Sequence, residues 1–317
     1  MPITRNSQRQ IAAILITCII AWGFAFVAMD VFPSYAFGLF VWLPIMIGTI
    51  STVIYAYKNQ TTRDGCRTVA YFALLTFCLG LLTFAFEGMI CIIMAAPIGL
   101  LFTWIGYRIG YAMIKSTIIN APLVSILLIV SVPCFMGFDY YGKDTKEDLR
   151  TVTTGIVINA PCEKVWQKVI AFSRIDEPTD LLFKAGIAYP INAKINGTGV
   201  GAIRHCNFST GSFVEPITKW NEPNLLQFDV AEQPATMKEL SFYNLQPNHL
   251  HGYFISKHGQ FKLIKLASNK TLLEGTTWYY NKIKPEIYWN IWSDYIIHKI
   301  HERVLNHIKT DAEATKN

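Results

Sequence analysis

The sequence FKLIKLASNKTLLEGTTWYYNKIKPEIYWNIWSDYIIHKIHERVLNHI, residues 261–308, contains two strand-like runs followed by a long helix-like run. Phe261–Leu266 and Thr271–Ile283 are rich in aromatic, β-branched and aliphatic residues, and the intervening Ala-Ser-Asn-Lys is typical of a turn. This pattern predicts a β-hairpin. Pro285 suits the first turn of a helix, and no further proline or glycine interrupts the run to His307. We therefore expect a C-terminal helix of about six turns after the hairpin.

Apolar residues surround this predicted helix almost completely, so most of its sides should be covered. Upstream, a first strand at Thr151–Ile158 leads through Ala160 and Pro161 into an amphipathic helix at Cys162–Phe172. A short helix and a run of strands follow, and the long helix comes last. The apolar residues of the long helix are Ile287, Tyr288, Ile291, Trp292, Tyr295, Ile296, Ile300, Val304 and Ile308.

This order of elements resembles the START-like superfamily, also called the SRPBCC group, which includes polyketide cyclases, lipid-transfer domains and birch-pollen-type proteins. The resemblance covers residues 150–310 and implies an α+β helix-grip fold, in which an antiparallel sheet wraps around the final helix and encloses an apolar cavity. No matching residue is a catalytic signature, so the resemblance implies no particular ligand. The matching residues are Ile158, Asn159, Ala160, Pro161, Val165, Trp166, Gly199 to Gly201, Glu215, Pro216, Ile217, Trp220 and Gly275 to Tyr279.

Composition indicates a second part that lies in a membrane. Of the 317 residues, 52% are hydrophobic and only 16% are charged, which is too apolar for an ordinary soluble protein. Most of the charge follows Asp139. We therefore expect an all-α transmembrane bundle in the first part of the chain and the START-like domain in the second. The predicted boundaries are 1–138 for the bundle, 139–150 for a linker, 151–310 for the domain and 311–317 for a tail.

Five membrane spans are predicted, because each run is about long enough to cross a hydrocarbon core of roughly 30 Å. The apolar run from 69 to 107 is too long for one helix, and it is divided at Glu87 and Gly88. Glu87 is interpreted as a solvated turn residue, with a buried functional acid as the alternative. The predicted spans are 11–32, 36–57, 69–86, 89–107 and 117–138.

Basic residues predict the orientation, since they concentrate in cytoplasmic loops. They precede the first span and fill the loops after the second and fourth spans, whereas the other turns carry none. Five spans then place the chain in the cell (inner) membrane, with its C-terminal domain on the periplasmic or extracytoplasmic side. Four spans, with residues 69–107 forming one crossing and a re-entrant piece, would place that domain inside. The basic residues are Arg5, Arg9, Lys58, Arg63, Arg67, Arg108 and Lys115.

Cysteine spacing and charge argue against several other classes. Four of the seven cysteines lie within apolar spans and no C-x-x-C occurs, so the cysteines indicate neither a metal site nor a disulfide framework. No cofactor is expected. Pairing of Cys162 with Cys206 stays open for an exported domain. The net charge is +6, but no basic run is interleaved with aromatic residues, so no nucleic-acid partner is expected. The sequence indicates no particular protein partner.

Three polar residues of the long helix are candidates for chemistry. Asp294, His298 and His301 are spaced at i, i+4 and i+7, which places them on one helical face. In a cavity they could act as an acid/base group or hold a metal. The alternative is a polar stripe that ties the helix to the sheet or to solvent.

The second predicted strand of the hairpin supplies candidate ligand-binding residues. By its period of two, one face of that strand carries Glu274, Thr276, Trp278 and Tyr280, and the other carries Gly275, Thr277 and Tyr279. We choose the Trp278 face as the inner one, since apolar walls with few polar anchors are typical of a ligand pocket. Ordinary sheet core is the alternative. Two further candidates come from elsewhere, namely Arg204 on an earlier strand and Trp292 on the long helix.

Two function classes follow. The first is a membrane-anchored module that binds a lipid or other hydrophobic small molecule as a carrier or sensor. The second is an enzyme of the cyclase or hydrolase kind that uses the Asp/His cluster. A binding protein needs an apolar cavity with few anchors, whereas an enzyme needs converging acid and base groups. The sequence favours the first class.

Overall fold

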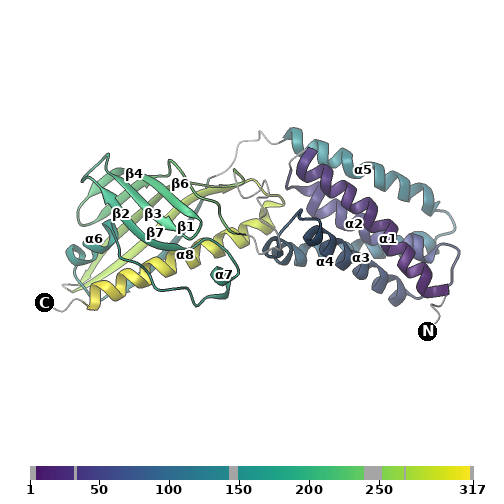
Figure 1. Ribbon diagram of the computed structural model, residues 1–317, viewed down its shortest axis with the longest axis horizontal. Coiled ribbons are helices and arrows are strands. Elements are labelled where there is room, and N and C mark those ends of the chain that lie inside the picture. The colour runs from purple at the N-terminus through teal and green to yellow at the C-terminus, as the bar shows by residue number, and fades with distance from the viewer. Residues whose placement is uncertain (1–4, 32–33, 143–148, 239–251, 268, 315–317) are drawn as a thin grey trace. The chain divides into compact units, whose positions relative to one another are not determined.

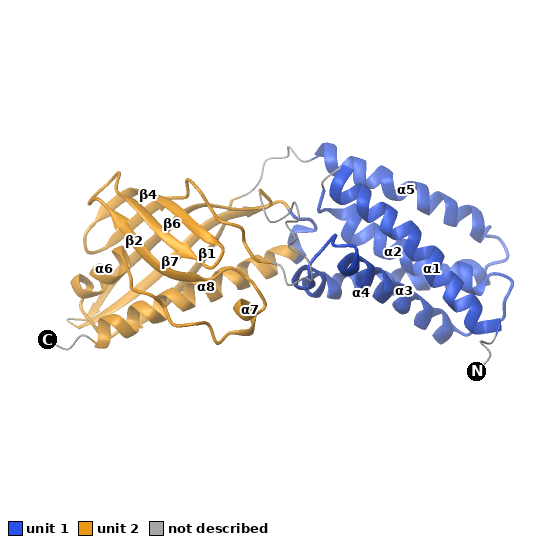
Figure 2. Ribbon diagram, viewed as in Figure 1, with its two compact units in different colours: residues 1–145, 239–248, 283–288 blue, residues 146–238, 249–282, 289–317 orange. Residues whose placement is uncertain are grey.

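The computed structural model (Figure 1) describes residues 5–31, 34–142, 149–238, 252–267 and 269–314. The chain divides into two compact units (Figure 2). Unit 1 comprises residues 1–145, 239–248 and 283–288. Unit 2 comprises residues 146–238, 249–282 and 289–317. Residues 143–148, half of the predicted linker 139–150, lie outside the described part.

Within the described residues, unit 1 contains five helical segments that are long and apolar enough to cross a membrane. Two of them, α3 and α4, occupy the long apolar run, where the four-span alternative expected one crossing and a re-entrant piece. Thr62 caps the start of α3 by accepting a hydrogen bond from the Gly65 N–H, so this helix begins well before its apolar part. The helices are α1 (Arg5–Phe26) with η1 (Val27–Val31), η2 (Gly38–Trp42) with α2 (Leu43–Ala56), α3 (Arg63–Thr83), α4 (Met89–Lys115) and α5 (Ala121–Tyr141).

Helix α2 is the central helix of unit 1 and contacts α1, α3, α4 and α5. Its contact with α4 depends on glycine, because a Cβ on Gly106 would lie 2.3 Å from the Ile45 carbonyl oxygen. A Cβ on Gly48 would lie equally close, 2.3 Å, to the Thr103 carbonyl oxygen. Thr49 Oγ1 donates a hydrogen bond of 3.0 Å to the Gly106 carbonyl oxygen. Glycine at such positions lets membrane helices approach closely and pack through their backbones.

The outer surfaces of these helices carry many exposed, large apolar side chains. Contiguous apolar surface of this kind is unusual on a protein surrounded by water, and it suits contact with lipid. Examples from four of the helices are Ile19, Phe72, Ile93, Leu127 and Val130.

Glu87 lies in the turn between α3 and α4, but it is buried rather than solvated. Tyr35 Oη donates a hydrogen bond of 2.9 Å to Glu87 Oε1. The interpretation of Glu87 as a solvated turn residue is therefore wrong. Sequence spacing identifies the turn, but it does not show that a residue 52 positions earlier in the chain reaches this carboxyl group.

In the part of unit 2 that the structure describes, seven strands form a sheet in the order β1-β7-β6-β5-β4-β3-β2, and every neighbouring pair is antiparallel. Strands β6 and β7 form the predicted hairpin. The strands are β1 (Arg150–Ile158), β2 (Pro190–Asn196), β3 (Ile203–Phe208), β4 (Gly211–Asn221), β5 (Leu225–Asp229), β6 (Phe254–Ala267) and β7 (Lys270–Asn281). Two short helices, α6 (Cys162–Ile170) and α7 (Leu181–Lys184), lie between β1 and β2 in the chain.

The long C-terminal helix α8 (Glu286–Ala314) packs along the curled sheet (Figure 1). It begins directly after Pro285, as predicted, but it is longer than expected, because residues 311–314 belong to it and not to a tail. An antiparallel sheet that curls against a final helix is the helix-grip arrangement. The expected fold of the second half of the chain is therefore confirmed.

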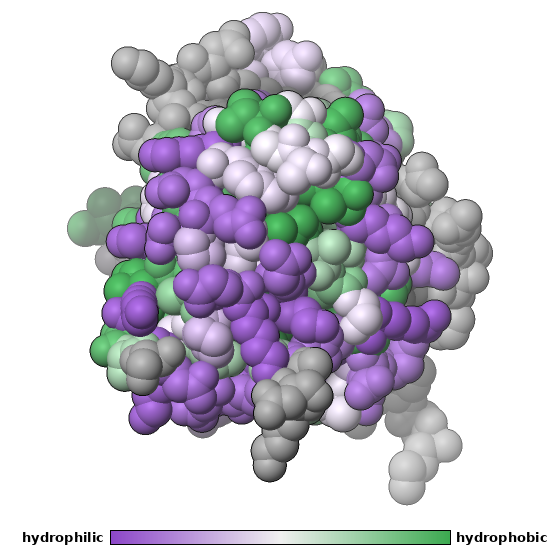
Figure 3. Space-filling view, turned by 90° about the vertical axis from the view of Figure 1, so that its left-hand side faces the viewer, coloured by the Kyte–Doolittle hydropathy of each residue, from purple (hydrophilic) through white to green (hydrophobic). Residues whose placement is uncertain are grey.

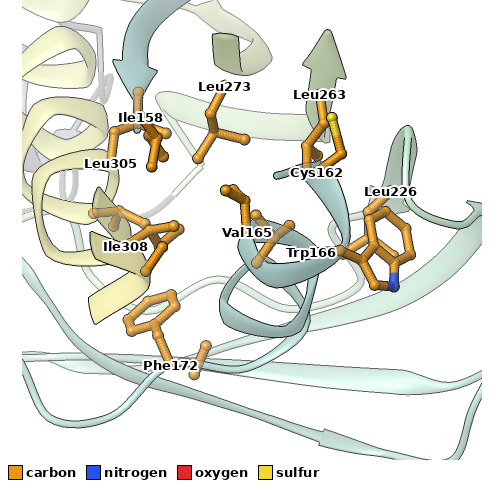
Figure 4. Close-up of a cluster of buried hydrophobic side chains, with 14 of the residues drawn as sticks. Ile158, Cys162, Val165, Trp166, Phe172, Leu226, Leu263, Leu273, Leu305 and Ile308 are labelled. Atoms are coloured by element: carbon orange, nitrogen blue, oxygen red, sulfur yellow. The ribbon is translucent and has the colours of Figure 1, made fainter. Parts of the chain in front are cut away.

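The core of unit 2 forms where α6 and the end of α8 meet the sheet (Figure 4). Val165 of α6 points toward Ile308 of α8, whereas the Trp166 ring points away from α8 toward Leu226, and all of these side chains are buried. Each fully buried side chain of this size stabilises the fold by about 1.5–3 kcal/mol. The face of unit 2 in Figure 3 is mostly hydrophilic, with a smaller hydrophobic area, which suits a domain in contact with water.

Candidate functional site

The register of the sheet decides which side chains face α8. Thr154 on β1 is paired with Gly275 on β7, and on this face Thr277 and Tyr279 follow Gly275. Tyr279 is completely buried there. Trp278 lies on the opposite face of β7, so the interpretation that placed the Trp278 face inside is wrong. Alternation separates the two faces of a strand, but both faces of β7 carry aromatic residues and the alternation could not say which face α8 covers.

A cavity of about 120 Å³ lies between the sheet and α8 within unit 2. Its walls are mostly apolar, with aromatic rings from four strands and aliphatic side chains from α8. Such walls with a few polar groups are typical of small-molecule sites. The large apolar wall residues are Phe208, Phe213, Phe228, Val230, Phe254, Phe261, Ile297, Ile300, Val304 and Leu305.

Arg204 and Glu215 form a buried ion pair in the wall of this cavity. The two residues are directly opposite each other in the β3–β4 register, which explains their contact. Arg204 Nε also donates a hydrogen bond of 3.3 Å to the Ile170 carbonyl oxygen. Burial raises the pKa of the Glu215 carboxyl, and the Arg204 guanidinium opposes that rise. A buried charge without a partner would be very unfavourable, so each member of the pair depends on the other.

Aromatic rings surround the Arg204 guanidinium. Its Cζ lies 5.5 Å from the centroids of both Phe228 and Phe261 and 5.6 Å from that of Phe172. Rings at this distance stabilise a cation through their π-electron faces. Cys206 lies two residues along β3, and burial raises the pKa of its thiol to about 12. The thiol is therefore protonated at neutral pH and is not a nucleophile.

Two histidines of α8 meet two threonines of the sheet. Thr154 Oγ1 lies 2.7 Å from His298 Nδ1 and 3.1 Å from His301 Nδ1. Thr277 Oγ1 lies 2.8 Å from His301 Nε2. His301 and Thr277 line the cavity, whereas His298 is exposed. Burial, with a smaller effect of His298, lowers the pKa of His301 to about 4, so its ring is neutral at pH 7.

Asp294 does not join the histidines, although it shares their helical face. Its carboxylate accepts a hydrogen bond of 2.5 Å from Tyr279 Oη and pairs with Arg150 at 2.7 Å. Burial and the Asp294 carboxylate raise the pKa of the Tyr279 hydroxyl. Hydrogen bonding to Asp294 also raises the pKa of Arg150. Asp294 therefore attaches α8 to the sheet and is not placed to act with His301.

Two of the sequence candidates line the cavity, Arg204 and His301. Tyr280 lies on the other face of β7, where Lys257 and Lys282 approach its ring at 5.4 and 5.8 Å. Five more candidates are not among the lining residues, namely Glu274, Trp278, Trp292, Asp294 and His298. His298 is linked to the lining residue His301 through Thr154. Among the described residues, no group of three His, Cys, Asp or Glu side chains could hold a metal.

Sequence reasoning did not assign Glu215, Thr154 and Thr277 to the site. Glu215 belongs to the residues that carry the resemblance, and an acid within a predicted strand is also a signal of a buried partner. No signal pointed to the threonines, which are ordinary strand residues. Cys162 and Cys206, whose pairing the sequence left open, are both free and buried.

Comparison with known proteins supplies no family assignment, since no family model and no curated protein matches the chain. Among solved structures, truncated norcoclaurine synthase from Thalictrum flavum is 12% identical, covers 55% of this chain and 99% of its own, and has a TM-score of 0.35. An aromatase/cyclase from a Streptomyces species is 13% identical, with 52% and 94% covered and a TM-score of 0.34. The Aha1 dimer from Colwellia psychrerythraea is 19% identical, with 53% and 99% covered and a TM-score of 0.31.

Proposed function

We propose that this chain is a membrane-anchored START-like domain that binds a small hydrophobic molecule in the cavity between its sheet and α8. The observation that carries the proposal is the cavity itself, with aromatic and aliphatic walls around the buried Arg204–Glu215 pair. Apolar walls supply affinity, and a few fixed polar groups supply orientation.

The size of the cavity favours a ligand of the size of a single ring. Its volume is about 120 Å³. An apolar cavity of about 150 Å³ holds one benzene molecule, whereas drug-sized ligands occupy about 300–1,000 Å³. A fatty-acyl chain would therefore require the sheet and α8 to separate. The sequence favours a lipid or another hydrophobic small molecule, and the volume of the cavity supports the small molecule.

The membrane role of unit 1 rests on its five apolar helices and their exposed apolar surfaces. In this proposal unit 1 anchors the binding domain at the membrane. Hydrophobic molecules concentrate in a bilayer, so an anchored binding domain would meet its ligand there at a raised local concentration. The distribution of basic residues supports an extracytoplasmic position of the domain at the inner membrane, as the sequence predicts.

The enzyme alternative required an Asp/His cluster that converges on the cavity. Asp294 is instead engaged with Tyr279 and Arg150, and only His301 of the three candidates lines the cavity. We therefore prefer the binding function to a cyclase or hydrolase activity based on that cluster.

Fluorobenzene binding to the full chain in detergent micelles, followed by ¹⁹F NMR, tests the proposal. Gly275 is open to the cavity, since a Cβ there would meet its nearest atoms, in Leu305, Phe261 and His301, at 3.7–3.9 Å. We expect a protein-bound fluorine signal that Gly275→Val abolishes by filling the cavity. Gly155→Val is the matched control, because Gly155 is paired with Glu274 on the other face of the sheet.

The same measurement separates the two ligand types. Excess palmitate should leave the bound fluorobenzene signal unchanged if the cavity takes only ring-sized molecules. Displacement by palmitate would instead identify a lipid as the occupant. A bound signal that persists in Gly275→Val, or the lack of any bound signal in the wild type, would contradict the proposed site.

A further inference from the structure

Thr154 occupies a position that links the two histidines of α8. Its hydroxyl lies within hydrogen-bonding distance of both Nδ1 atoms, at 2.7 Å from His298 and 3.1 Å from His301. His298 and His301 are three residues apart on the helix and so lie on adjacent turns of one face. Thr154 projects from β1 toward that face, on the side of the sheet where Gly275 opens into the cavity.

Proton counting restricts the protonation of this cluster. A hydroxyl group has one proton and can donate one hydrogen bond, and a neutral imidazole carries a proton on only one of its two nitrogens. If Thr154 donates to His301 Nδ1, then His298 Nδ1 must carry a proton and donate to Thr154. The opposite arrangement is equally consistent with the distances. The two arrangements differ by the shift of one proton along each hydrogen bond.

The proton movement can continue from His301 to the cavity. His301 Nε2 lies 2.8 Å from Thr277 Oγ1, so a proton that arrives at Nδ1 allows the proton at Nε2 to leave toward Thr277. Both His301 and Thr277 line the cavity. At the other end the exposed His298 can exchange protons with water. A continuous series of hydrogen bonds therefore runs from solvent to the cavity.

We propose that His298, Thr154, His301 and Thr277 form a proton path between solvent and the cavity, and that the domain catalyses proton exchange of a small, enolisable carbonyl compound bound there. This inference rests on the proposed binding function, because the ligand must occupy the same cavity. It assigns an acid/base role to His301 without Asp294, and it names the ligand class as a small cyclic ketone or a molecule with equivalent chemistry.

The chemistry balances without any other reactant. The carbon–hydrogen bond next to the carbonyl group breaks, its electron pair stays on the ligand as the enolate, and the proton passes to Thr277 Oγ1 while the hydroxyl proton of Thr277 moves to His301 Nε2. The Nδ1 proton of His301 moves through Thr154 to His298 Nδ1, and His298 releases its Nε2 proton to water. A proton that returns along the same atoms forms the new carbon–hydrogen bond. The neutral His301 ring suits this role, since it passes a proton from one nitrogen to the other without storing charge.

The first test needs no ligand. The full chain in detergent micelles is labelled with ¹⁵N-histidine, and long-range ¹H–¹⁵N NMR assigns the protonated nitrogen of His298 and His301 among the seven histidines. The path requires that, at any moment, one of the two Nδ1 atoms carries a proton and the other does not, and that the two arrangements interconvert. Two bare Nδ1 atoms, or two protonated ones, would break the path and overturn the inference.

The second test measures exchange of cyclopentanone in D₂O by ¹H NMR with the same protein. Removing an acid/base group typically lowers a rate by about 10²-fold or more, so the wild type should exchange the α-protons at least about tenfold faster than Thr154→Val. Thr154→Ser keeps the hydroxyl group and should retain the exchange. Both variants should keep the fluorobenzene signal, which shows that they fold and that the cavity is intact.

The outcomes separate this inference from the proposed function. Fluorobenzene binding without cyclopentanone exchange would overturn the proton path and leave the binding function standing. Exchange in Thr154→Val at the wild-type rate would also overturn the path, as would failure of cyclopentanone to displace fluorobenzene. Absence of any bound fluorobenzene in the wild type would contradict the binding function, and the histidine protonation pattern would still decide whether the path exists.

Discussion

Gly275 and Gly259 are neighbouring-strand residues in the wall of one cavity, but they have different surroundings. A Cβ on Gly275 would meet its nearest atoms at 3.7–3.9 Å, which is ordinary contact, whereas a Cβ on Gly259 would lie 2.4 Å from the ring of Phe228. Glycine weakens a strand interior because it has more conformational freedom to lose on folding.

These surroundings predict opposite effects of the same substitution. Gly275→Ala should stabilise the domain by about 0.5–1 kcal/mol, since it restricts the unfolded chain and fits the available space. Gly259→Ala should destabilise it by about 1–3 kcal/mol through overpacking against Phe228. Thermal unfolding of the two variants in detergent micelles, monitored by tryptophan fluorescence, measures both. Equal changes in stability for the two variants would contradict the different spaces described around Gly275 and Gly259.

The lowered pKa of His301 predicts that the stability of the domain depends on pH. Its pKa is lowered from the usual 6.5 to about 4 in the folded protein, mainly by burial. Below pH 6.5 the unfolded chain therefore binds a proton that the folded chain does not, and stability falls as the pH falls toward 4. The full effect of such a shift is roughly 3 kcal/mol at and below pH 4.

The variant His301→Gln removes this titration. Its thermal midpoint should therefore fall less than that of the wild type between pH 7.5 and 4.5. Identical pH dependence in the two proteins would show that His301 does not titrate as described.

At the scale of residues, the sequence could identify a member of the candidate site where the type of a single side chain was sufficient evidence. Arg204 is such a case, because a cation within an apolar strand requires special surroundings. Its partner Glu215 could not be assigned, since their contact depends on the β3–β4 register. The Trp278 face was chosen wrongly for a related reason, because only the position of α8 distinguishes the two faces of β7.

At the scale of elements, local signals were sufficient for the hairpin and the final helix. Turn residues separated β6 from β7, and Pro285 placed the start of α8. The helix boundaries in unit 1 were less accurate, because helices continue into polar sequence that hydropathy does not detect. α4, for example, extends to Lys115, beyond the predicted end at residue 107.

The packing of α2 against α4 gives a prediction with an internal control. A Cβ on Gly106 would lie 2.3 Å from the Ile45 carbonyl oxygen, a backbone atom that cannot rotate away. Gly99 is on the same helix, and the nearest atom to a Cβ there is Leu74 Cδ1 at 3.9 Å. Gly106→Ala should therefore destabilise the bundle by about 1–3 kcal/mol.

Gly99→Ala should be neutral or slightly stabilising, because alanine is favoured over glycine in a helix by about 1 kcal/mol. The thermal midpoint of detergent-solubilised protein compares the two variants. A Gly106→Ala protein as stable as Gly99→Ala would show that α2 and α4 are not in the close contact described.

At the scale of the whole molecule, the uneven distribution of charge predicted two parts in two solvents. The structure has an apolar helical unit and a unit with a curled sheet, which agrees with that division. The sequence could not indicate that residues 283–288 cluster with the helical unit, although they lie far beyond it in the chain. That association depends on contacts between distant segments, such as the hydrogen bond from the Lys284 N–H to the Tyr35 carbonyl oxygen.

In the proposed membrane-anchored protein, the number of crossings determines on which side of the membrane unit 2 lies. An odd number places the two ends of the chain on opposite sides, and five helical segments within the described residues are each long enough to cross. Basic residues lie in the first turns of α1, between the end of α2 and the first turns of α3, and in the last turns of α4, which predicts a cytoplasmic N-terminus. The α3–α4 turn then lies outside, and there the burial of Glu87 against Tyr35 keeps its carboxyl group from solvent.

We therefore expect residue 317 to lie outside the cytoplasm. Alkaline phosphatase fused to the C-terminus should be active, because it folds only after export, and a fluorescent protein that matures only in the cytoplasm should be dark. Fusions after residue 60, in the loop between α2 and α3, should give the reverse pattern and serve as the control. A bright fluorescent fusion at the C-terminus would require an even number of crossings, and one of the five helices would then have to lie along or within the membrane without crossing it.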